Sequence, residues 1–244
     1  MAVSIWTDGA TAYLEACQVA ATNVTAFNNF KRDPALREVW EHISESQGKA
    51  YLYVTKGLDP HCDFHPAIVN DRFGNPFLME LSYDFKISPG TSRYVWMAYM
   101  LKRLFGSRMD GMDIVEIGGG YGGLAVVLHQ YFKPDQYEIF DLPEPAALQL
   151  EYAAANDLEL QIGSLCQERK SSLAISTFAL SELSDEQQAE YADKVLRHAD
   201  RGFIVSNEPH RRTFDLIKSL DKPNVEIAYE PVQDWCYMVW WGAK

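Results

Sequence analysis

The spacing of apolar positions along the chain changes character at Asp113. Before that residue, apolar side chains recur at the three-to-four-residue spacing of helices, which predicts helices over about residues 4–48. Asp33, followed by a proline, is expected to cap one of them. A further helix is predicted from Gly90 to Phe105, and residues 57–89, rich in Pro, Gly, Asn and Asp, are predicted to form loops with short elements.

After Asp113 the pattern alternates between strand and helix. The predicted strands are Asp113–Ile117, Gln136–Asp141, Glu159–Gly163, Ser172–Thr177, Gly202–Ser206, Val225–Tyr229 and Cys236–Trp241. The predicted helices are Gly122–Phe132, Pro145–Asn156, Asp185–His198 and Phe214–Leu220. Such alternation predicts a mostly parallel sheet covered on both faces. The last two strands are joined without a helix, so we expect an antiparallel hairpin at the carboxyl terminus.

The fold class expected from this pattern is α/β. It is a Rossmann-like, seven-stranded, mostly parallel sheet with an antiparallel C-terminal hairpin and a helical N-terminal extension. We place residues 1–106 in a helical region that covers the acceptor, and residues 107–244 in the domain that binds a cofactor. In such sheets, ligands bind beyond the carboxyl ends of the strands.

Charge and cysteine content narrow the classes of partner. The chain has 34 acidic and 22 basic residues, a net charge of −12, which argues against nucleic acid and against anionic membranes as main partners. No apolar run approaches the ~20 residues that span a bilayer, and the N-terminus lacks the pattern of a signal peptide. The cysteines are far apart, which predicts reduced thiols and a cytoplasmic protein. They are Cys17, Cys62, Cys166 and Cys236.

A glycine-rich turn joins the first strand after Asp113 to its helix. Gly118, Gly120 and Gly122 form G-x-G-x-G, and Gly123 completes an equally good G-x-G-x-x-G. Glycines allow positive φ and the close approach of a ligand to the backbone. The spacing fits S-adenosylmethionine as well as a nicotinamide or flavin cofactor. Asp141, about 20 residues further on, suits the ribose hydroxyls of either.

Glu116 separates these two cofactors. It stands two residues before Gly118, at the end of the strand. A carboxylate at this place would face the cationic amino group of a methionine moiety, whereas it would repel a pyrophosphate. We therefore expect S-adenosylmethionine as the cofactor. The alternative is a tight strand-to-helix turn with two solvated carboxylates, Glu116 and Asp141.

Several segments resemble the class I S-adenosylmethionine-dependent methyltransferases, and more narrowly the bacterial sugar O-methyltransferase family. The resemblance covers roughly residues 75–210. It is carried by E-I-G-G-G-Y-G-G at 116–123, I-F-D-L-P-E at 139–144, S-P-G-T-S-R-Y at 88–94, F-A-L-S-E-L-S at 178–184 and G-F-I-V-S-N at 202–207. It implies methylation of a sugar hydroxyl in the assembly of a glycan or a glycosylated metabolite. It also implies that Arg93 meets the cofactor carboxylate.

Residues that follow the other strands complete the predicted site. Leu142, Ser164 and Thr177 are expected to contact the cofactor, although Thr177 stands where relatives would have an amide side chain. Removal of the hydroxyl proton calls for a general base. The candidates, all after the fourth and fifth strands, are Glu182, Glu208 and His210.

Two of the candidate bases have a structural alternative. Glu182 is expected to be partly buried, which would raise its pKa, or else to belong to the acidic start of the helix at Asp185. His210 has a near-neutral pKa that suits proton removal, or it is a surface histidine in a loop. The neighbouring Arg211 and Arg212 would clamp a diphosphate or carboxylate of the acceptor, or form a solvated charged run.

We expect no bound metal, because the segment from His61 to His65 lacks a clear further ligand. A divalent ion held by Asp84, Asp141 and Glu182 stays an open alternative. The expected partner is a small-molecule or glycan acceptor, and the sequence leaves a homodimer open.

Three other functions remain as alternatives. They are methylation of a phenol or carboxylate, a nicotinamide-dependent oxidoreductase, and a scaffold that binds partners without catalysis.

Overall fold

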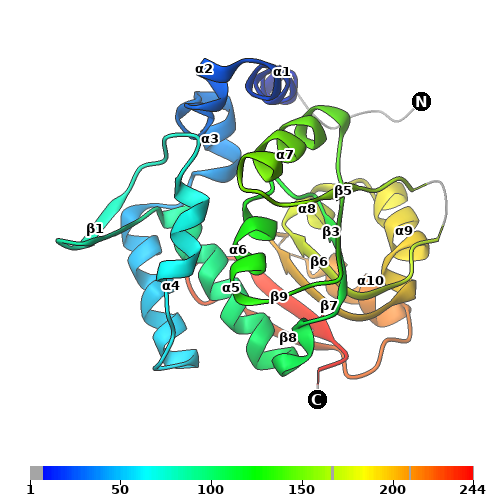
Figure 1. The fold of residues 1–244 in the computed structure, drawn as a ribbon. Helices are drawn as coiled ribbons and strands as arrows, with labels where there is room; N and C mark the ends of the chain where they lie inside the picture. The colour runs from blue at the N-terminus through cyan, green and yellow to red at the C-terminus, as the bar shows by residue number, and fades with distance from the viewer. Residues whose placement is uncertain (1–7, 166–167, 209, 244) are drawn as a thin grey trace. The chain divides into compact units, whose positions relative to one another are not determined.

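The computed structural model describes residues 8–165, 168–208 and 210–243. Figure 1 labels the helices and strands along the chain. The chain divides into two compact units, and neither is continuous in sequence. The first, called the helical unit, comprises Met1–Met100, Gly120–Tyr131 and Leu142–Glu159. The second, called the sheet unit, comprises Leu101–Gly119, Phe132–Asp141 and Leu160–Lys244.

The helical unit contains most of the helices that come before the seven-stranded sheet in the sequence. It also contains two helices that connect strands of that sheet. Its elements are α1 (Asp8–Thr22), α2 (Val24–Phe27), η1 (Phe30–Arg32), α3 (Pro34–Trp40), α4 (Glu45–Leu58), η2 (His65–Asp71), β1 (Met79–Ser82), β2 (Phe85–Ile87), most of α5 (Pro89–Phe105), α6 (Gly123–Tyr131) and α7 (Pro143–Ala155). Helix α1 packs against α7, and η2 packs against α6. The antiparallel pair β1 and β2 forms a small ribbon.

The caps of these helices agree with simple sequence rules. The Asp33 side chain accepts hydrogen bonds from the amides of Ala35 and Leu36, which confirms the predicted start of α3. Ser44 and Gln47 form a capping box at the start of α4. Helix α4 continues to Leu58, ten residues beyond the predicted end of the helical region at residue 48.

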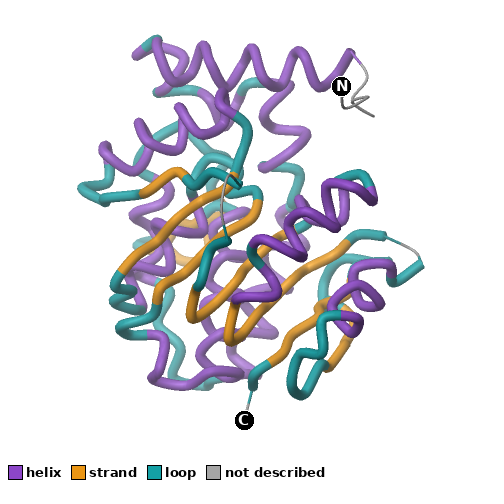
Figure 2. The backbone as a smooth tube through the Cα atoms, turned by 90° about the vertical axis from the view of Figure 1, so that its right-hand side faces the viewer, coloured by secondary structure: helices purple, strands orange, loops and turns teal. Residues whose placement is uncertain are grey.

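The sheet unit is built on a seven-stranded sheet with the order β5-β4-β3-β6-β7-β9-β8. Its strands are β3 (Asp113–Ile117), β4 (Gln136–Phe140), β5 (Gln161–Ile162), β6 (Ser171–Thr177), β7 (Ala199–Ser206), β8 (Glu226–Tyr229) and β9 (Tyr237–Trp241), drawn in orange in Figure 2. Strands β3 to β7 run parallel, and β9 lies antiparallel between β7 and β8. The predicted fold class, including the antiparallel C-terminal hairpin, is confirmed.

One face of this sheet is buried by helices of the same unit. These helices are α8 (Ala179–Glu182), α9 (Asp185–Lys194), η4 (Leu196–His198) and α10 (Arg212–Ser219). The short helix η3 (Gly106–Met109) precedes β3 in the same unit. Val115, Ala174 and Ile204 of the sheet pack with Leu180 and Ile217 of these helices. Gly202 is required there, because a Cβ atom at this position would lie 1.9 Å from the Trp241 ring.

The other face carries an apolar row with one acid in it. Strand register aligns Ile139, Glu116, Ile175 and Phe203 across β4, β3, β6 and β7. The three apolar members are fully buried, and Glu116 is 1% exposed. The position of Glu116 is therefore set by the sheet.

The remaining expectations concern cysteines and membranes. Cys17, Cys62 and Cys236 are not joined to one another by disulfides, while Cys166 lies outside the described residues. Among the residues that the structure describes, no helix has both the length and the apolar character needed to cross a bilayer.

Candidate functional site

The first half of the glycine turn lies in the sheet unit and is held at the ends of β3 and β4. Gly118 has φ +74, and its amide donates to the Phe140 carbonyl at 2.9 Å. The next amide, of Gly119, donates to Asp141 Oδ2 at 3.0 Å. A Cβ atom at Gly118 would lie only 2.0 Å from Ala179 Cβ. Both the backbone angle and the packing therefore require glycine at this position.

The second half of the turn lies in the helical unit. Gly120 and Gly122 have φ values of +58 and +87, so all three glycines of the predicted motif adopt positive φ. The Gly120 carbonyl accepts a hydrogen bond from Gln149 Nε2 at 2.9 Å. A Cβ atom on Gly120 would lie 3.2 Å from Trp40 Nε1. The turn is thus in close contact with a side chain of α3, which the sequence did not indicate.

Glu116 is a buried acid of the sheet unit. Its Oε2 accepts a hydrogen bond from the Tyr137 hydroxyl at 2.8 Å. Burial raises the pKa of Glu116 to about 8; the Tyr137 hydrogen bond works against this shift, and the nearby Asp141 charge adds to it. The carboxyl is therefore mostly protonated at neutral pH, whereas an ionised carboxylate was expected at this position.

The residues predicted after β4 and β5 lie at the ends of those strands. Asp141 follows β4 directly, is partly buried and holds the Gly119 amide. Leu142 is 48% exposed and caps α7 in the helical unit, and Ser164 is exposed beyond β5. In a parallel sheet, these strand ends share one edge with the end of β3. The roles of these residues toward a cofactor stay predictions.

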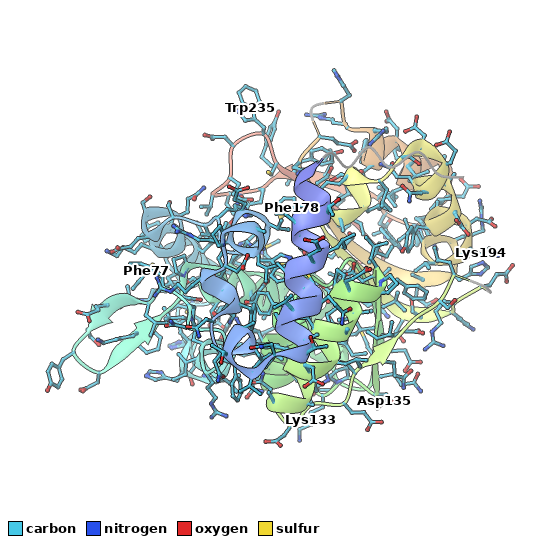
Figure 3. All side chains as sticks on the ribbon, turned by 90° about the horizontal axis from the view of Figure 1, so that it is seen from above. Phe77, Lys133, Asp135, Phe178, Lys194 and Trp235 are labelled. Atoms are coloured by element: carbon cyan, nitrogen blue, oxygen red, sulfur yellow. The ribbon has the colours of Figure 1, made fainter. Side chains whose placement is uncertain are left out.

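The segment after β6 contains a feature that the sequence did not reveal. Thr177 ends the strand, and Phe178 has φ +73, which is unusual for a bulky side chain (Figure 3). The Phe178 carbonyl accepts from Ser181 Oγ at 2.6 Å, and its amide donates to the Val205 carbonyl at 2.8 Å. Strained backbone of this kind gathers at functional sites. A phenylalanine gives no sequence signal for it.

Glu182 differs from its expected environment. It ends the short helix α8 and is exposed, so the expected partial burial beside Phe178 and Leu180 is wrong. Helix α8 is a single turn, which leaves its last residue in solvent. Glu182 Oε1 accepts from Asn207 Nδ2 at 3.1 Å, and Asn207 Oδ1 accepts from Ser181 Oγ at 2.9 Å. These bonds join α8 to the loop after β7.

Glu208 is held firmly in that loop. Its Oε1 accepts from the Tyr237 hydroxyl at 2.7 Å and from the Thr213 amide, and its Oε2 accepts from Arg212 Nε at 3.0 Å. Burial opposes ionisation, but the hydrogen bonds from Thr213, Tyr237 and Arg212 outweigh it, so the pKa of Glu208 is lowered. An ionised, fully engaged carboxylate is well suited to anchoring the start of α10.

The neighbouring basic residues divide into two environments. Arg212 contacts Glu208 and also donates from Nη1 to Asp185 Oδ1 at 2.7 Å, so it belongs to an ion-pair network. Arg211 is exposed, has φ +54, and donates from Nη2 to the Tyr229 hydroxyl at 3.4 Å. His210 is exposed beside them.

In the helical unit, a buried polar cluster surrounds the turn residue Tyr121. Lys31 is 1% exposed; its Nζ donates to the Asn70 carbonyl at 2.5 Å and lies 4.6 Å from the centre of the Tyr121 ring. Asn70 Nδ2 in turn donates to the Tyr121 hydroxyl at 3.0 Å. Burial lowers the pKa of Lys31, and the charge of Glu41 partly counters it. A lone lysine in a helical segment gave no sign of this burial.

Arg93 lies in the second turn of α5 in the same unit and is 6% exposed. Its guanidinium carbon lies 5.6 Å from the centre of the Tyr94 ring. An arginine buried to this extent does not form a solvent-exposed ion pair of the kind that contributes little to stability. Its predicted contact with a cofactor carboxylate stays a prediction.

The possible metal ligands do not assemble within the described part of the chain. There, no three His, Cys, Asp or Glu side chains form a group that could hold an ion. Asp63 Oδ1 instead accepts the His65 amide at 3.0 Å and lies 2.9 Å from His65 Nδ1. The pair is a local turn contact.

Comparisons with solved structures concern the fold. Thermoplasma acidophilum protein 1320 matches with a TM-score of 0.51 and 11% identity over 74% of this chain and 95% of that one. The N-methyltransferase NodS from Bradyrhizobium japonicum, solved with S-adenosyl-L-homocysteine, matches with a TM-score of 0.47 and 14% identity over 59% of this chain and 84% of its own. An O-methyltransferase family protein from Burkholderia thailandensis has a TM-score of 0.46 and 11% identity over 62% of this chain and 59% of that one.

No family model and no curated protein matches the sequence. The fold is thus shared with solved proteins at an identity that says nothing of substrate.

Proposed function

We propose that this protein is an S-adenosylmethionine-dependent O-methyltransferase that acts on a sugar hydroxyl. The observation that carries the proposal is the glycine turn after β3, fastened by Asp141 from the end of β4, in a sheet whose strand β9 is inserted antiparallel. This combination is typical of methyltransferases, whereas dinucleotide-binding sheets lack the antiparallel insertion.

The cofactor would use the three features of the turn. Amides at positive-φ glycines and the start of α6 would accommodate the nucleoside part, and Asp141 would accept hydrogen bonds from the ribose hydroxyls. Glu116 would face the methionine amino group. Because its pKa is about 8, it does not repel a pyrophosphate at neutral pH, so its charge alone no longer excludes a dinucleotide. A bound ammonium group would favour the carboxylate and draw off its proton.

Methyl transfer is a displacement at a carbon that the sulfonium already activates. The protein has to align donor and acceptor, which is worth ~7–11 kcal/mol, and to accept the hydroxyl proton. Glu182 and His210 are the proposed bases, since both are exposed and available to an acceptor, whereas Glu208 is committed to Thr213, Tyr237 and Arg212. The sugar as acceptor rests on the resemblance of residues 88–94, 178–184 and 202–207 to sugar O-methyltransferases.

The test is a transfer assay. The protein is incubated with methyl-labelled S-adenosylmethionine and a panel of nucleotide sugars, glycans, phenols and carboxylic acids, and products are identified by mass. The proposal predicts label on a sugar hydroxyl, and none with the Asp141→Ala variant. Label found only on phenols or carboxylates would contradict the proposal that the acceptor is a sugar hydroxyl. Binding of NAD with no transfer from any methyl donor would overturn the cofactor.

A further inference from the structure

The loop between β8 and β9 lies at the edge of the sheet where ligands are expected. Because β9 is antiparallel to both of its neighbours, β8 points the same way as β7. Strand register places Ser206, Tyr237 and Tyr229 in one row at the carboxyl ends of β7 and β8. The connecting residues 230–236 therefore rise from the same edge as the glycine turn after β3.

This loop presents a tryptophan to solvent. Trp235 is 85% exposed and has φ +67, and Figure 3 shows it at the outer side of its loop. A large indole ring gains nothing from exposure, and a left-handed backbone angle is costly for any residue but glycine. Two unfavourable features at one residue call for a function that offsets them.

The loop is held rigidly beneath that ring. The Glu230 amide donates to the Cys236 carbonyl at 3.0 Å and closes the loop. The Glu230 side chain is 6% exposed, and its Oε2 accepts the amides of Val232 at 2.8 Å and Gln233 at 2.5 Å. A buried carboxylate inside the loop thus fixes its shape. The exposed Trp235 is therefore a pre-organised feature.

A second aromatic ring stands at the end of the adjoining strand. Tyr229 is 73% exposed, and its hydroxyl accepts from Arg211 Nη2 at 3.4 Å. The Arg211 guanidinium carbon lies 5.9 Å from the centre of the Tyr229 ring, which orients both side chains. Arg211 itself has φ +54 at the start of α10. Arg211 and Tyr229 therefore form a pair of exposed flat groups, and Trp235 lies in the loop that continues from the strand that Tyr229 ends.

We propose that Trp235, with Tyr229 and Arg211, binds a sugar residue of the acceptor that is distant from the methylated hydroxyl. The inference rests on the proposed function and deepens it. Sugar rings present flat C–H faces that pack on aromatic rings, and their hydroxyls pair with a guanidinium. Strands lie ~4.8 Å apart, so β9 is roughly 14 Å from β3 along the edge. That span exceeds one sugar ring, so the acceptor is an oligosaccharide or a glycoconjugate.

The experiment measures glycan binding by the full chain saturated with S-adenosylhomocysteine, on an array of short and long oligosaccharides. Trp235→Ala is expected to weaken binding of the long members roughly tenfold and that of single sugars little, and Trp235→Phe should restore most of the loss. Leu150→Ala is the control, because Leu150 is 46% exposed on α7, outside the region that was expected to cover the acceptor. Its binding should equal that of the unaltered protein.

Affinity for S-adenosylhomocysteine is measured for every variant by calorimetry. Failure of the unaltered protein to bind it would refute the proposed function, whatever the glycans do. With that affinity intact, the inference is overturned by an absence of oligosaccharide binding, or by equal binding to Trp235→Ala. The inference would also be overturned if the unaltered protein sediments as a dimer and Trp235→Ala as a monomer, because the Trp235 ring would then be a subunit contact.

Discussion

At the scale of single residues, Glu116 is the buried acid that precedes the glycine turn. It occupies an apolar row of the sheet, where its neighbours on β4 and β6 are Ile139 and Ile175. A protein tolerates an acid there only in its neutral form or beside a compensating charge. The raised pKa of about 8 is the expected consequence. A cofactor ammonium group is a charge that would make the ionised form favourable.

The Glu116→Gln variant tests this at the level of stability. The folded pKa of about 8 exceeds the ordinary value of 4.5, so between these pH values the folded state keeps a proton that the unfolded state has lost. The free energy of unfolding therefore falls as pH rises through this window, by several kcal/mol at ~1.36 kcal/mol per pKa unit. Glutamine keeps an acceptor for Tyr137 and cannot ionise. In denaturant unfolding, the stability of the variant relative to the unaltered protein should increase from about pH 4.5 to about 8. The same pH dependence of stability in both proteins would contradict the raised pKa of Glu116.

Gly118 carries the geometry of the turn. Gly118→Ala places a methyl group 2.0 Å from Ala179 Cβ and keeps φ at +74. We expect a loss of stability of roughly 2–4 kcal/mol, from overpacking and from the left-handed angle together. Thermal and denaturant unfolding measure it.

Ala179→Gly supplies the control for that loss. In the double variant, which combines Gly118→Ala with Ala179→Gly, the clash is removed but the positive φ at residue 118 remains. Only part of the stability lost in Gly118→Ala should therefore return. Full recovery, or no loss in Gly118→Ala, would show that the turn relaxes freely.

The two proposed bases are separated by kinetics. Glu182→Gln and His210→Asn are both exposed changes, so neither should alter stability by more than ~0.5 kcal/mol. Loss of the true base should lower kcat by ~10²–10⁴-fold with unchanged affinity for S-adenosylhomocysteine. Unchanged kcat in both variants would place proton removal elsewhere.

At the scale of elements, the parallel strands could be predicted because each is an apolar run bounded by turn residues. Strand β3 has the predicted bounds, and the others differ by a few residues at their ends. Helix α8 could not be predicted, because its single turn depends on the positive φ of Phe178 and on Ser181 bonding back to the Phe178 carbonyl. The ribbon of β1 and β2 was hidden because its exposed strands lack a clear alternation.

Glu208 joins two elements, α10 and β9. Its pKa is lowered, so its contribution to stability is present above the ordinary value of 4.5 and is lost as pH falls through the folded pKa. Glu208→Gln should cost ~1–3 kcal/mol at pH 7, since the carboxylate bonds to Thr213 and Arg212 are replaced by weaker ones. Chemical denaturation measures the loss.

S-adenosylhomocysteine affinity serves as the control for Glu208→Gln, and it should not change. A large fall in kcat without a loss of stability would instead make Glu208 the base.

At the scale of the whole molecule, chain order is a poor guide to the compact units. Helices α6 and α7 alternate with the strands in sequence, yet they cluster with the N-terminal helices, α7 packing on α1 and α6 on η2. Sequence periodicity reports which face of a helix is apolar, but it does not name the partner of that face. The burial of Lys31 beneath Tyr121 is hidden for the same reason.

The candidate site was predictable where backbone geometry dictates residue type. Gly118, Gly120 and Gly122 all have the positive φ that the motif implied, and Asp141 stands at the turn. Side-chain environments were not predictable, because burial depends on tertiary packing. Glu116 was expected to be ionised, but burial raises its pKa to about 8. Partial burial was one of two expectations for Glu182, and that side chain is exposed.

The central claim is that the turn after β3 binds S-adenosylmethionine through Glu116. The most direct test is a calorimetric titration with S-adenosylhomocysteine at pH 7, in two buffers of different ionisation enthalpy, with NAD as the competing ligand. The account predicts binding that releases about one proton, because the ammonium group converts a protonated Glu116 to its carboxylate, and no release in Glu116→Gln. Binding of NAD in place of S-adenosylhomocysteine, or binding without proton release, would contradict it.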